Sequence, residues 1–500
     1  MPLVVLVVGV GGLAMLLPGA HAAWVGDARV AEIFLLYGVL TLLGGALVGL
    51  AQAGRRRSDN PRRHLGTLFA LFVALPLLFA LPFQAAVQQT TFLNAYVEMV
   101  SALTTTGATL FDDAGRLSDS LHLWRAVVAW MGGLFIWVGA VAVLAPMSLG
   151  GFELRVGGGQ QGVAGGPIQE RADLSARVRR FTVALAPLYI ALTALVAGLL
   201  VLAGDAPLAA TIHAMSTLST SGITLPGGVS GAGAGMISEV IVAVFLLFAL
   251  SRATFSYTPS AQNASRFDRL RHDPEIRMAA ALITIVPAFL FFRHFIGAYE
   301  VAGAGLNLAE GIGALWGSVF TVLSFLTTAG FESAAWQGAR SWSGLETPGL
   351  ILAGLALFGG GVATTAGGAK LLRVYALYRH GLREMEKLVH PNSVGGGGTS
   401  GILQRGAAFR AWLFFMLMTL SLAIVMMAFA WFGAGFERAM ILSISALTTT
   451  GPLLDVAAQE PVHLGLISVP EKLVYTGAMV LGRLETLAIV ALFSPDLWRR

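Results

Sequence analysis

Residues 101–108 read Ser-Ala-Leu-Thr-Thr-Thr-Gly-Ala, and this stretch decides the fold because the chain contains four versions of it. Variants follow at 216–223 (STLSTSGI), 324–331 (SFLTTAGF) and 445–452 (SALTTTGP). Each copy has a serine, a few apolar or small residues, a hydroxyl-rich run and a glycine, and each lies between long apolar segments. An internal repeat has to be interpreted before any local feature. The four copies indicate four units of one design: a helix, a short re-entrant piece and a second helix.

The composition excludes an ordinary soluble domain. Of the 500 residues, 56% are hydrophobic and 12% are charged, whereas an ordinary soluble domain has about 25% charged residues. The sequence therefore predicts an all-α protein that crosses a lipid bilayer several times. The chain has no cysteine, which rules out disulfides, thiol catalysis and thiolate metal sites.

The apolar segments divide the chain into five predicted parts. Two transmembrane helices occupy 1–64, and the first of them is expected to end at Pro18. The tripeptide Ala-His-Ala at 20–22 resembles a signal-peptidase site, but no Lys or Arg precedes it, which favours a retained helix. The four units are predicted at 65–150, 179–258, 276–380 and 406–500.

Basic residues are concentrated in the loops between units and are scarce around the repeated motif. The motif loops contain only Arg116, Arg340, Arg438 and Lys472. By the positive-inside rule, the loops between units face the cytoplasm and the motif loops face outward. All four units then run in the same direction, which argues against the inverted repeats of many secondary transporters.

The piece before each motif is predicted to be a short helix that enters the membrane from outside and ends near its middle. The four pieces are expected at 91–103, 208–218, 308–326 and 436–447. Irregular backbone at that depth is tolerated only where it lines water or is buried in protein. Glycine permits the dihedral angles that aim carbonyl oxygens inward, and rings of carbonyls can replace the water shell of a monovalent cation.

The motif is therefore interpreted as an ion filter built around one axis. The alternative is that hydroxyl-rich and glycine-rich runs merely let helices pack closely, but four copies in the same context favour the filter. The predicted filter residues are Thr105, Thr106 and Gly107; Thr220, Ser221 and Gly222; Thr328, Ala329 and Gly330; and Thr449, Thr450 and Gly451.

A second glycine cluster interrupts the long apolar run of unit three. Each interior glycine weakens a helix by about 1 kcal/mol relative to alanine. The cluster indicates either tight helix packing or an intramembrane loop below the filter that acts as a gate. Lys370 follows the cluster, either as an internal tethered cation or as a side chain that reaches the interface. The glycines are Gly359, Gly360, Gly361, Gly367 and Gly368.

Arg483 lies ten residues into the apolar run that starts at Leu473. A charge at that depth is costly and usually faces a cavity or a partner. Two interpretations stay open: an electrostatic barrier below the filter, or an ion pair with a carboxylate from another helix. Glu485 does not share a helix face with Arg483, because only two positions separate them.

Several other polar residues have weaker signals. Acidic side chains follow three of the filters, and they either concentrate cations at the outer mouth or are ordinary loop acids. Those residues are Asp112, Asp113, Glu332 and Asp455. Glu98 and His213 lie in the short helices, where a packing hydrogen bond is expected. The glycine-rich stretches 157–166 and 395–398 lack Gly-Lys-Ser/Thr and are interpreted as linkers rather than phosphate-binding loops.

Taken with these motifs, the chain resembles the membrane subunits of the Trk/Ktr/HKT superfamily of potassium transporters, and most closely the bacterial TrkH type. The four filter sequences and the two helices before unit one carry the resemblance over essentially the whole chain. Three shorter motifs also match: His-Asp-Pro-Glu-Ile-Arg at 272–277, Val-His-Pro-Asn at 389–392 and Gly-Arg-Leu-Glu at 482–485. Ile223, where many relatives have phenylalanine, and Pro452 depart from the family pattern.

The resemblance implies potassium uptake by a multi-pass protein of the bacterial inner membrane, with potassium ions in the filter. It also implies a homodimer and a cytosolic nucleotide-binding regulatory ring of the TrkA type, with no nucleotide on this chain and no nucleic-acid partner. The 359–368 segment would be the gate, and Arg483 would be the barrier. A proton- or sodium-coupled potassium symporter and a less selective sodium/potassium pathway stay open as alternatives. An intramembrane enzyme is disfavoured, because neither Gly-x-Ser-x-Gly nor His-Glu-x-x-His occurs.

Overall fold

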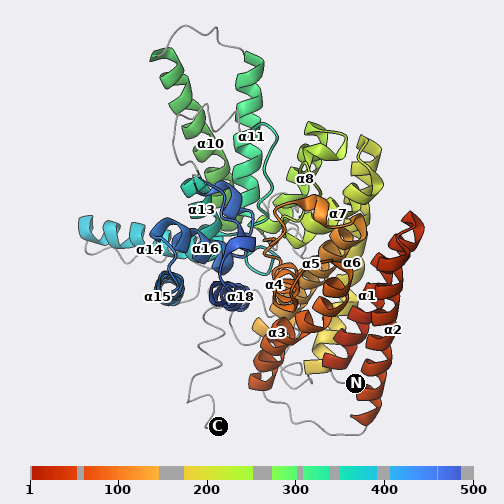
Figure 1. Cartoon of the computed structure of the whole chain (residues 1–500). Helices are drawn as coiled ribbons and strands as arrows, with labels where there is room; N and C mark the ends of the chain where they lie inside the picture. The colour runs from red at the N-terminus through yellow and green to blue at the C-terminus, as the bar shows by residue number, and fades with distance from the viewer. Residues whose placement is uncertain are drawn as a thin grey trace, which may run out of the picture.

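The computed structural model describes residues 3–52, 61–145, 174–251, 273–300, 308–336, 349–390, 406–458 and 460–485. The regular elements in these ranges are helices, and no β-strand occurs among them (Figure 1). This confirms the predicted all-α class. The glycine-rich stretches 157–166 and 395–398, and part of the basic loops between units, lie outside the described residues.

Two long helices precede the repeats and pack against each other: α1 (Leu3–Val25) and α2 (Ala28–Ala51). The prediction that the first helix ends at Pro18 was wrong, because α1 continues seven residues beyond it. A proline removes one helical hydrogen bond, but unwinding in lipid would leave more backbone groups without partners. Within the described ranges, seven helices, α1 and α2 among them, are long and apolar enough to cross a membrane.

The helices that follow come in an order consistent with four repeats, each with a long first helix, a short second one and a third. The first two groups are α3 (Pro61–Ala86), α4 (Phe92–Leu103) and α5 (Asp119–Gly139), then α6 (Leu174–Ala203), α7 (Pro207–Ser219) and α8 (Met236–Leu246). The other two are α10 (Pro274–Glu300), α11 (Leu308–Leu326) and α13 (Gly349–Phe358), then α15 (Ala407–Trp431), α16 (Phe436–Thr448) and α18 (Val469–Leu484). The repeat boundaries at 65–150, 179–258, 276–380 and 406–500 stay a prediction.

The short helices α4, α7, α11 and α16 lie within one residue of where the sequence predicts them. Local signals explain their starts. At the start of α4, the Thr91 hydroxyl accepts a hydrogen bond from the Asn94 N–H at 3.3 Å, as is typical of an N-cap threonine. Pro207 opens α7, where its missing N–H costs nothing.

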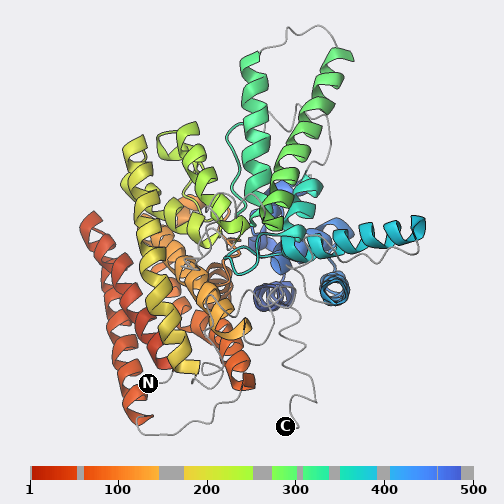
Figure 2. The ribbon, with the colours of Figure 1, turned by 180° about the vertical axis from the view of Figure 1, so that it is seen from behind.

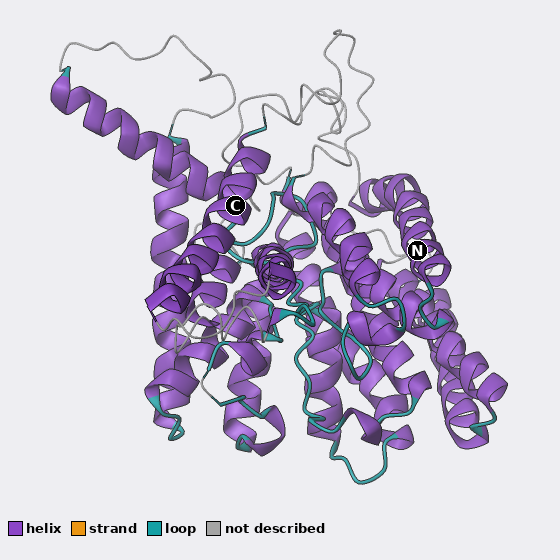
Figure 3. Ribbon diagram, turned by 90° about the horizontal axis from the view of Figure 1, so that it is seen from above, coloured by secondary structure: helices purple, strands orange, loops and turns teal. Residues whose placement is uncertain are grey.

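The third helix of each group contacts the short helix of the next, which closes the groups into a ring. The contacting pairs are α5 with α7, α8 with α11, α13 with α16, and α18 with α4. The last pair joins the end of the chain to the first group. Viewed from above, the loops gather in the middle of the helices (Figure 3). The centre of this ring is therefore where the repeated motifs meet.

The long apolar run of unit three is broken below the ring centre. Helix α13 ends at Phe358, residues 359–370 form turns and bends, and α14 (Leu371–Val389) follows. The far end of α14 projects from the body of the molecule (Figures 1 and 2). Its large apolar side chains Tyr378, Met385 and Leu388 are exposed.

Candidate ion-binding site

All four short helices end with a threonine in the left-handed region of backbone space. A β-branched residue with positive φ is an outlier, and such strain costs about 1–3 kcal/mol where the surroundings hold it in place. Glycine, which has no Cβ, is the usual residue at this position of a helix end. The φ angles are +54° at Thr105, +52° at Thr220, +56° at Thr328 and +54° at Thr449.

The same pair of hydrogen bonds closes each helix. In the first copy, the Thr106 N–H donates to the Ser101 carbonyl at 2.8 Å, and the Thr105 N–H donates to the Ala102 carbonyl at 2.9 Å. The other three copies repeat both bonds, with N···O distances between 2.9 and 3.3 Å. This is a Schellman ending. It satisfies two carbonyls of the last turn and turns the chain sharply at the threonine.

In three of the four copies, the serine that opens the motif forms a hydrogen bond to the filter strand that follows the helix. The Ser101 hydroxyl donates to the Ala108 carbonyl at 2.6 Å. The Ser445 hydroxyl donates to the Thr450 carbonyl at 3.0 Å. In the second copy, the Ser216 and Ser221 hydroxyls are hydrogen-bonded at 3.0 Å. These three bonds join the last turn of a short helix to the filter strand that follows it. The matching hydroxyl of the third copy, on Ser324, is buried without a partner among the described residues.

Three of the four filter glycines have the positive φ expected from the sequence. The angles are +73° at Gly107, +69° at Gly222 and +79° at Gly330. The expectation was wrong for Gly451, which is outside the left-handed region. Its N–H instead donates to the Thr106 carbonyl at 2.6 Å, and after Pro452 the chain enters the short helix α17 (Leu453–Val456). Gly451 is needed for space, since a Cβ there would lie 2.5 Å from the Ala108 Cα.

The four filter segments touch each other in cyclic order. A Cβ on Gly107 would overlap the Ser221 carbonyl, and one on Gly222 would overlap the Ala329 carbonyl. A Cβ on Gly330 would lie 2.8 Å from Pro452 Cγ, and Gly451 adjoins Ala108 as described above. The structure therefore brings all twelve predicted filter residues together around one centre.

The threonine carbonyls at this centre are buried without a donor. Thr105, Thr220, Thr328 and Thr449 are each about 1% exposed, and no described residue donates a hydrogen bond to their carbonyl oxygens. Buried carbonyls are almost always paired, so this level of the filter suits a ligand that needs oxygen atoms. A dehydrated monovalent cation is such a ligand.

The next level of carbonyls is less symmetric. The Thr106 carbonyl accepts from the Gly451 N–H, and the Thr450 carbonyl accepts from Ser445 and from the Leu453 N–H at 3.3 Å. For Ser221 and Ala329, no described residue donates to the carbonyl. Only the Ser221 and Ala329 carbonyls are therefore available to an ion at this level. Pro452, which departs from the family pattern, follows the fourth filter glycine, close to the two carbonyls that are already hydrogen-bonded.

A cavity of about 460 Å³ lies on the side of the filter glycines away from the 359–370 segment. All four glycines line it, together with three of the acidic residues considered from the sequence: Asp112, Glu332 and Asp455. Burial and the neighbouring Asp112 raise the pKa of Asp455. Asp113 does not line the cavity and accepts a hydrogen bond from the Gly115 N–H at 2.9 Å. Arg125 and His463 also line the cavity, and His463 Nδ1 lies 3.1 Å from Asp112 Oδ1. Because Arg125 is paired with Glu98, the three carboxylates dominate the charge of a cavity that has direct access to the filter.

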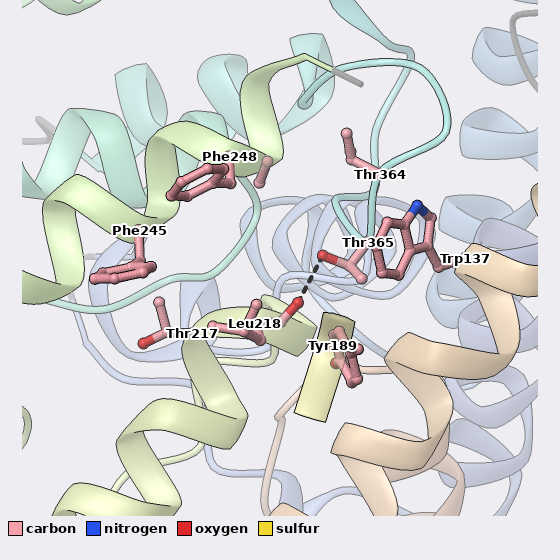
Figure 4. Close-up of a pocket in the computed structure, with 9 residues that line it drawn as sticks. Trp137, Tyr189, Thr217, Leu218, Phe245, Phe248, Thr364 and Thr365 are labelled. Atoms are coloured by element: carbon pink, nitrogen blue, oxygen red, sulfur yellow. Dashed lines mark hydrogen bonds between the residues drawn. The ribbon is translucent and has the colours of Figure 1, made fainter. Parts of the chain in front are cut away.

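On the opposite side, the 359–370 segment is bonded to the ends of the short helices. The Thr365 hydroxyl donates to the Leu218 carbonyl at 3.0 Å, inside a pocket also lined by Trp137 and Tyr189 (Figure 4). The Gly367 N–H donates to Thr328 Oγ1 at 2.7 Å. A Cβ on Gly367 would overlap the Thr448 carbonyl. The segment therefore lies directly below the filter.

The other glycines of this segment let it fold back on itself. Gly359 and Gly368 have φ of +69° and +73° and face each other, with Gly368 Cα 2.7 Å from a Cβ on Gly359. Gly361 lies against Leu250, where a Cβ would lie 2.6 Å from the Leu250 carbonyl carbon. Close approach explains Gly360 too, since a Cβ there would lie 2.7 Å from the Ala249 carbonyl oxygen.

Two buried basic residues contact the segment: Lys370, its last residue, and Arg483 of α18. Lys370 is 6% exposed, and its Nζ donates to the Ala366 carbonyl, so it is an internal cation and does not reach the interface. Arg483 donates through NH1 to the Thr365 carbonyl at 2.7 Å. Its Nε and NH2 are buried and have no hydrogen-bond partner among the described residues. No carboxylate of the described residues forms an ion pair with Arg483, and that of Glu485 pairs with Arg373 at 2.8 Å, so the interpretation of Arg483 as the partner of a carboxylate from another helix finds no support in the described ranges.

A packing hydrogen bond was expected for both Glu98 and His213. Glu98 forms one and an ion pair in addition, whereas the expectation was wrong for His213. Glu98 forms a buried ion pair with Arg125 at 2.6 Å and also accepts the Leu110 N–H at 2.9 Å. Both ring nitrogens of His213 are buried without a partner in the described ranges. The signal for this ion pair in the sequence is a single arginine, Arg125, within the apolar run of α5.

This chain is similar to known cation transport proteins over most of its length. The family model described as "TrkH: Cation transport protein" matches residues 68–230 and 276–500. The Trk system potassium uptake protein TrkH of Halomonas elongata is 30% identical over 475 residues, which cover 92% of this chain and 91% of that protein. TrkH of Salmonella typhimurium is 28% identical over 97% of this chain and 96% of its own length.

A solved structure agrees with these relatives. The crystal structure of the potassium transporter TrkH from Vibrio parahaemolyticus superposes with a TM-score of 0.80 at 25% sequence identity, over 99% of this chain and 98% of that chain. This likeness confirms the all-helical membrane fold predicted from the repeats. The family model covers well over half of the sequence, and so this chain belongs to the TrkH family of cation transport proteins.

Proposed function

We propose that this chain carries potassium ions into the bacterial cell across the cytoplasmic membrane, through the filter at the centre of the ring. The observation that carries the proposal is the level of four buried threonine carbonyls without a donor. A ring of carbonyl dipoles can replace the water around a monovalent cation. The short helices support this, because they point their partly negative C-terminal ends at the same place. The relatives named above are potassium uptake proteins.

The proposed route runs from the acidic outer cavity through the filter to the segment below it. Asp112, Glu332 and Asp455 raise the local cation concentration at the outer mouth. The ion is held in the filter by Thr105, Thr106 and Gly107 and by their counterparts in the other three copies. The 359–370 segment then obstructs the path as a gate, and Arg483 adds an electrostatic barrier beside it.

Flux measurements on purified protein in liposomes test the proposal. Wild-type protein should pass potassium and rubidium in preference to sodium, and Gly107→Ala should reduce that preference. Equal fluxes of the three ions would favour a less selective sodium/potassium pathway. An imposed proton or sodium gradient that drives potassium against its own gradient would favour the coupled symporter. Potassium flux that follows only its own gradient and the membrane potential supports the channel-like form.

We also propose that the chain works as a homodimer with a cytosolic nucleotide-binding ring of the TrkA type. The family resemblance is the main support. The exposed apolar side chains at the far end of α14 add to it, since a projecting helix offers a surface for a partner. Light scattering on the detergent-solubilised protein should give the mass of two chains. A single-chain mass in several detergents would contradict the dimer.

A further inference from the structure

The extended segment after each filter glycine has main-chain N–H groups that need hydrogen-bond acceptors on the side away from the pathway. We use "outer limb" for the three residues after each filter glycine: 108–110, 223–225, 331–333 and 452–454. In the first copy, the last N–H of the limb, from Leu110, donates to the Glu98 carboxylate at 2.9 Å. In the third copy, the matching N–H of Ser333 donates to Thr321 Oγ1 at 3.4 Å. Glu98 and Thr321 occupy the same place, nine residues before the filter glycine.

The fourth copy explains why this position can also be apolar. Leu442 stands nine residues before Gly451. The matching N–H, from Leu454, donates to the Gly451 carbonyl at 3.0 Å, since the limb has already turned into α17. The Leu454 N–H therefore needs no side-chain acceptor from the short helix, and the apolar Leu442 can occupy that position.

The second copy has the acceptor residue without the bond. His213 stands nine residues before Gly222 and is fully buried. Neither of its ring nitrogens has a partner among the described residues. The outer limb of the second filter therefore lacks the support that the first and third limbs have, so the four limbs are not held equally.

In the first copy, the acceptor behind the limb is charged and paired. The third limb has a charged acceptor too, because the buried Glu239 of α8 accepts the Ser333 hydroxyl and the Ala334 N–H, both at 2.8 Å. Glu98 is 1% exposed and Arg125 5% exposed, and their side chains approach to 2.6 Å. A hydrogen bond to an ionised acceptor is about twice as strong as one between neutral groups. Arg125 comes from α5 and also lines the outer cavity. The ion pair thus connects the third helix of the group, the short helix and the limb.

We propose that Glu98, fixed by Arg125, is a positioning residue for ion selectivity, and that the residue nine places before the filter glycine has this role in the first and third copies. The inference rests on the filter assignment proposed above. Glu98 does not touch the ion. Its carboxylate accepts the N–H of Leu110. Through the outer limb, this bond fixes the direction of the carbonyl of Gly107 and of the filter carbonyls that precede it.

The test uses rubidium and sodium fluxes in liposomes for three variants of the ion pair. Glu98→Gln leaves an amide oxygen near the Leu110 N–H, but it removes the charge of the acceptor and its pairing with Arg125. We expect the rubidium/sodium flux ratio to fall by about tenfold, which corresponds to about 1.4 kcal/mol. The double variant Glu98→Gln/Arg125→Gln removes the unpaired positive charge from the cavity wall but does not restore the support, so its ratio should stay low. Arg438→Gln is the matched control. It breaks another arginine–glutamate pair on a short helix, with Glu471 at 2.7 Å, and should keep the wild-type ratio.

A gentler pair of variants covers the case in which Glu98→Gln fails to fold. Thr321→Val removes the hydroxyl behind the third limb and keeps the side-chain shape, so the ratio should fall by about threefold, in line with a weak neutral hydrogen bond. Thr321→Ser keeps the hydroxyl and should restore the ratio.

Three results would overturn the proposal. One is an unchanged ratio in folded Glu98→Gln, another is recovery in the double variant, and the third is an unchanged ratio in Thr321→Val. Wild-type protein that does not discriminate between the ions would instead remove the filter assignment and this proposal together. Loss of discrimination in Gly107→Ala with none in Glu98→Gln would remove only the support role.

Discussion

The main-chain N–H of Gly367 donates to the side-chain oxygen of Thr328 at 2.7 Å, so the segment below the filter is bonded to a residue of the filter itself. Thr328 therefore has two functions. Its main chain forms the left-handed turn of the third filter, and its hydroxyl holds the segment in place. If the segment moves aside as the proposed gate, it must break this bond or pull on Thr328, so the proposed opening is expected to be coupled to the backbone of the proposed filter.

Thr365→Val is expected to raise basal potassium flux. The change keeps the side-chain shape but removes the hydrogen bond to the Leu218 carbonyl, so the segment is held less firmly. One buried hydrogen bond contributes about 1 kcal/mol, which corresponds to a rise of about fivefold if release of the segment limits flux. Thr364→Val is the matched control, because its hydroxyl bonds within the segment, to the Gly361 carbonyl. Equal fluxes in the two variants would contradict the gate.

Arg483→Ala should increase flux and leave selectivity unchanged. At about 6 Å and an effective dielectric constant near 20, a fixed positive charge repels a monovalent cation by roughly 3 kcal/mol. Removal of a limiting barrier of that size is worth on the order of a hundredfold in rate. Stopped-flow flux on monodisperse protein measures it. Stable protein with wild-type flux would place Arg483 outside the ion path.

Substitution of Gly107 and Gly451 by alanine should lower selectivity for two different reasons. At Gly107 the new Cβ is strained by a φ of +73° and also overlaps the Ser221 carbonyl. Gly451 is outside the left-handed region, so at that position the overlap of the new Cβ with Ala108 is the cause. We expect a loss of at least tenfold in the rubidium/sodium ratio at both positions, with the larger loss at Gly107. Normal discrimination in both variants would be incompatible with the filter.

Thr105→Gly is expected to stabilise the fold and weaken selectivity together. Glycine relieves a left-handed strain of about 1–3 kcal/mol, so the thermal unfolding midpoint should rise. The same change loosens the backbone at the level of the donor-free carbonyls, and the rubidium/sodium ratio should fall. A lower midpoint would mean that the Thr105 side chain contributes more by packing than its backbone strain costs.

External acid should reduce potassium uptake through Asp455 when potassium is scarce. Burial and Asp112 raise the pKa of this carboxyl, so it takes up a proton at a less acidic pH than an ordinary aspartate, and the outer cavity loses negative charge as the pH falls. Uptake against external pH, at low potassium, should decline earlier in wild type than in Asp455→Asn. At saturating potassium the two profiles should coincide. A decline of the same size in both proteins would exclude Asp455 as its cause.

The sequence was sufficient to place the four short helices and the motifs that meet at the centre of the ring. The bounds of α11 coincide with the predicted 308–326, and those of the other short helices differ by at most one residue at each end. The agreement arises because the repeated serine-to-glycine motif marks where each short helix ends. The glycines that break the apolar run of unit three mark a real interruption. The helix bounds and this interruption both depend on the residue types in the segment itself, and these can be read from the sequence.

The details of the filter depend on packing, and there the sequence was less informative. It pointed to glycine for the left-handed backbone, yet each copy also places a threonine there, and Gly451 does not take that conformation. Those outcomes depend on how neighbouring segments press on each other. The Glu98–Arg125 pair joins residues of two helices, and nothing in a single sequence states which buried charge will meet which.

The contact between the first and last copies has a consequence for how the protein is made. The Gly451 N–H bonds to the Thr106 carbonyl, and Lys472 of α18 bonds to Asn94 of α4 at 3.0 Å. The first filter segment therefore leaves the ribosome long before the residues that complete it. A nascent chain should pass most of its synthesis with an unfinished, non-conducting centre, because such distant pairings form late. The membrane would then be protected from ion leakage until translation is almost complete.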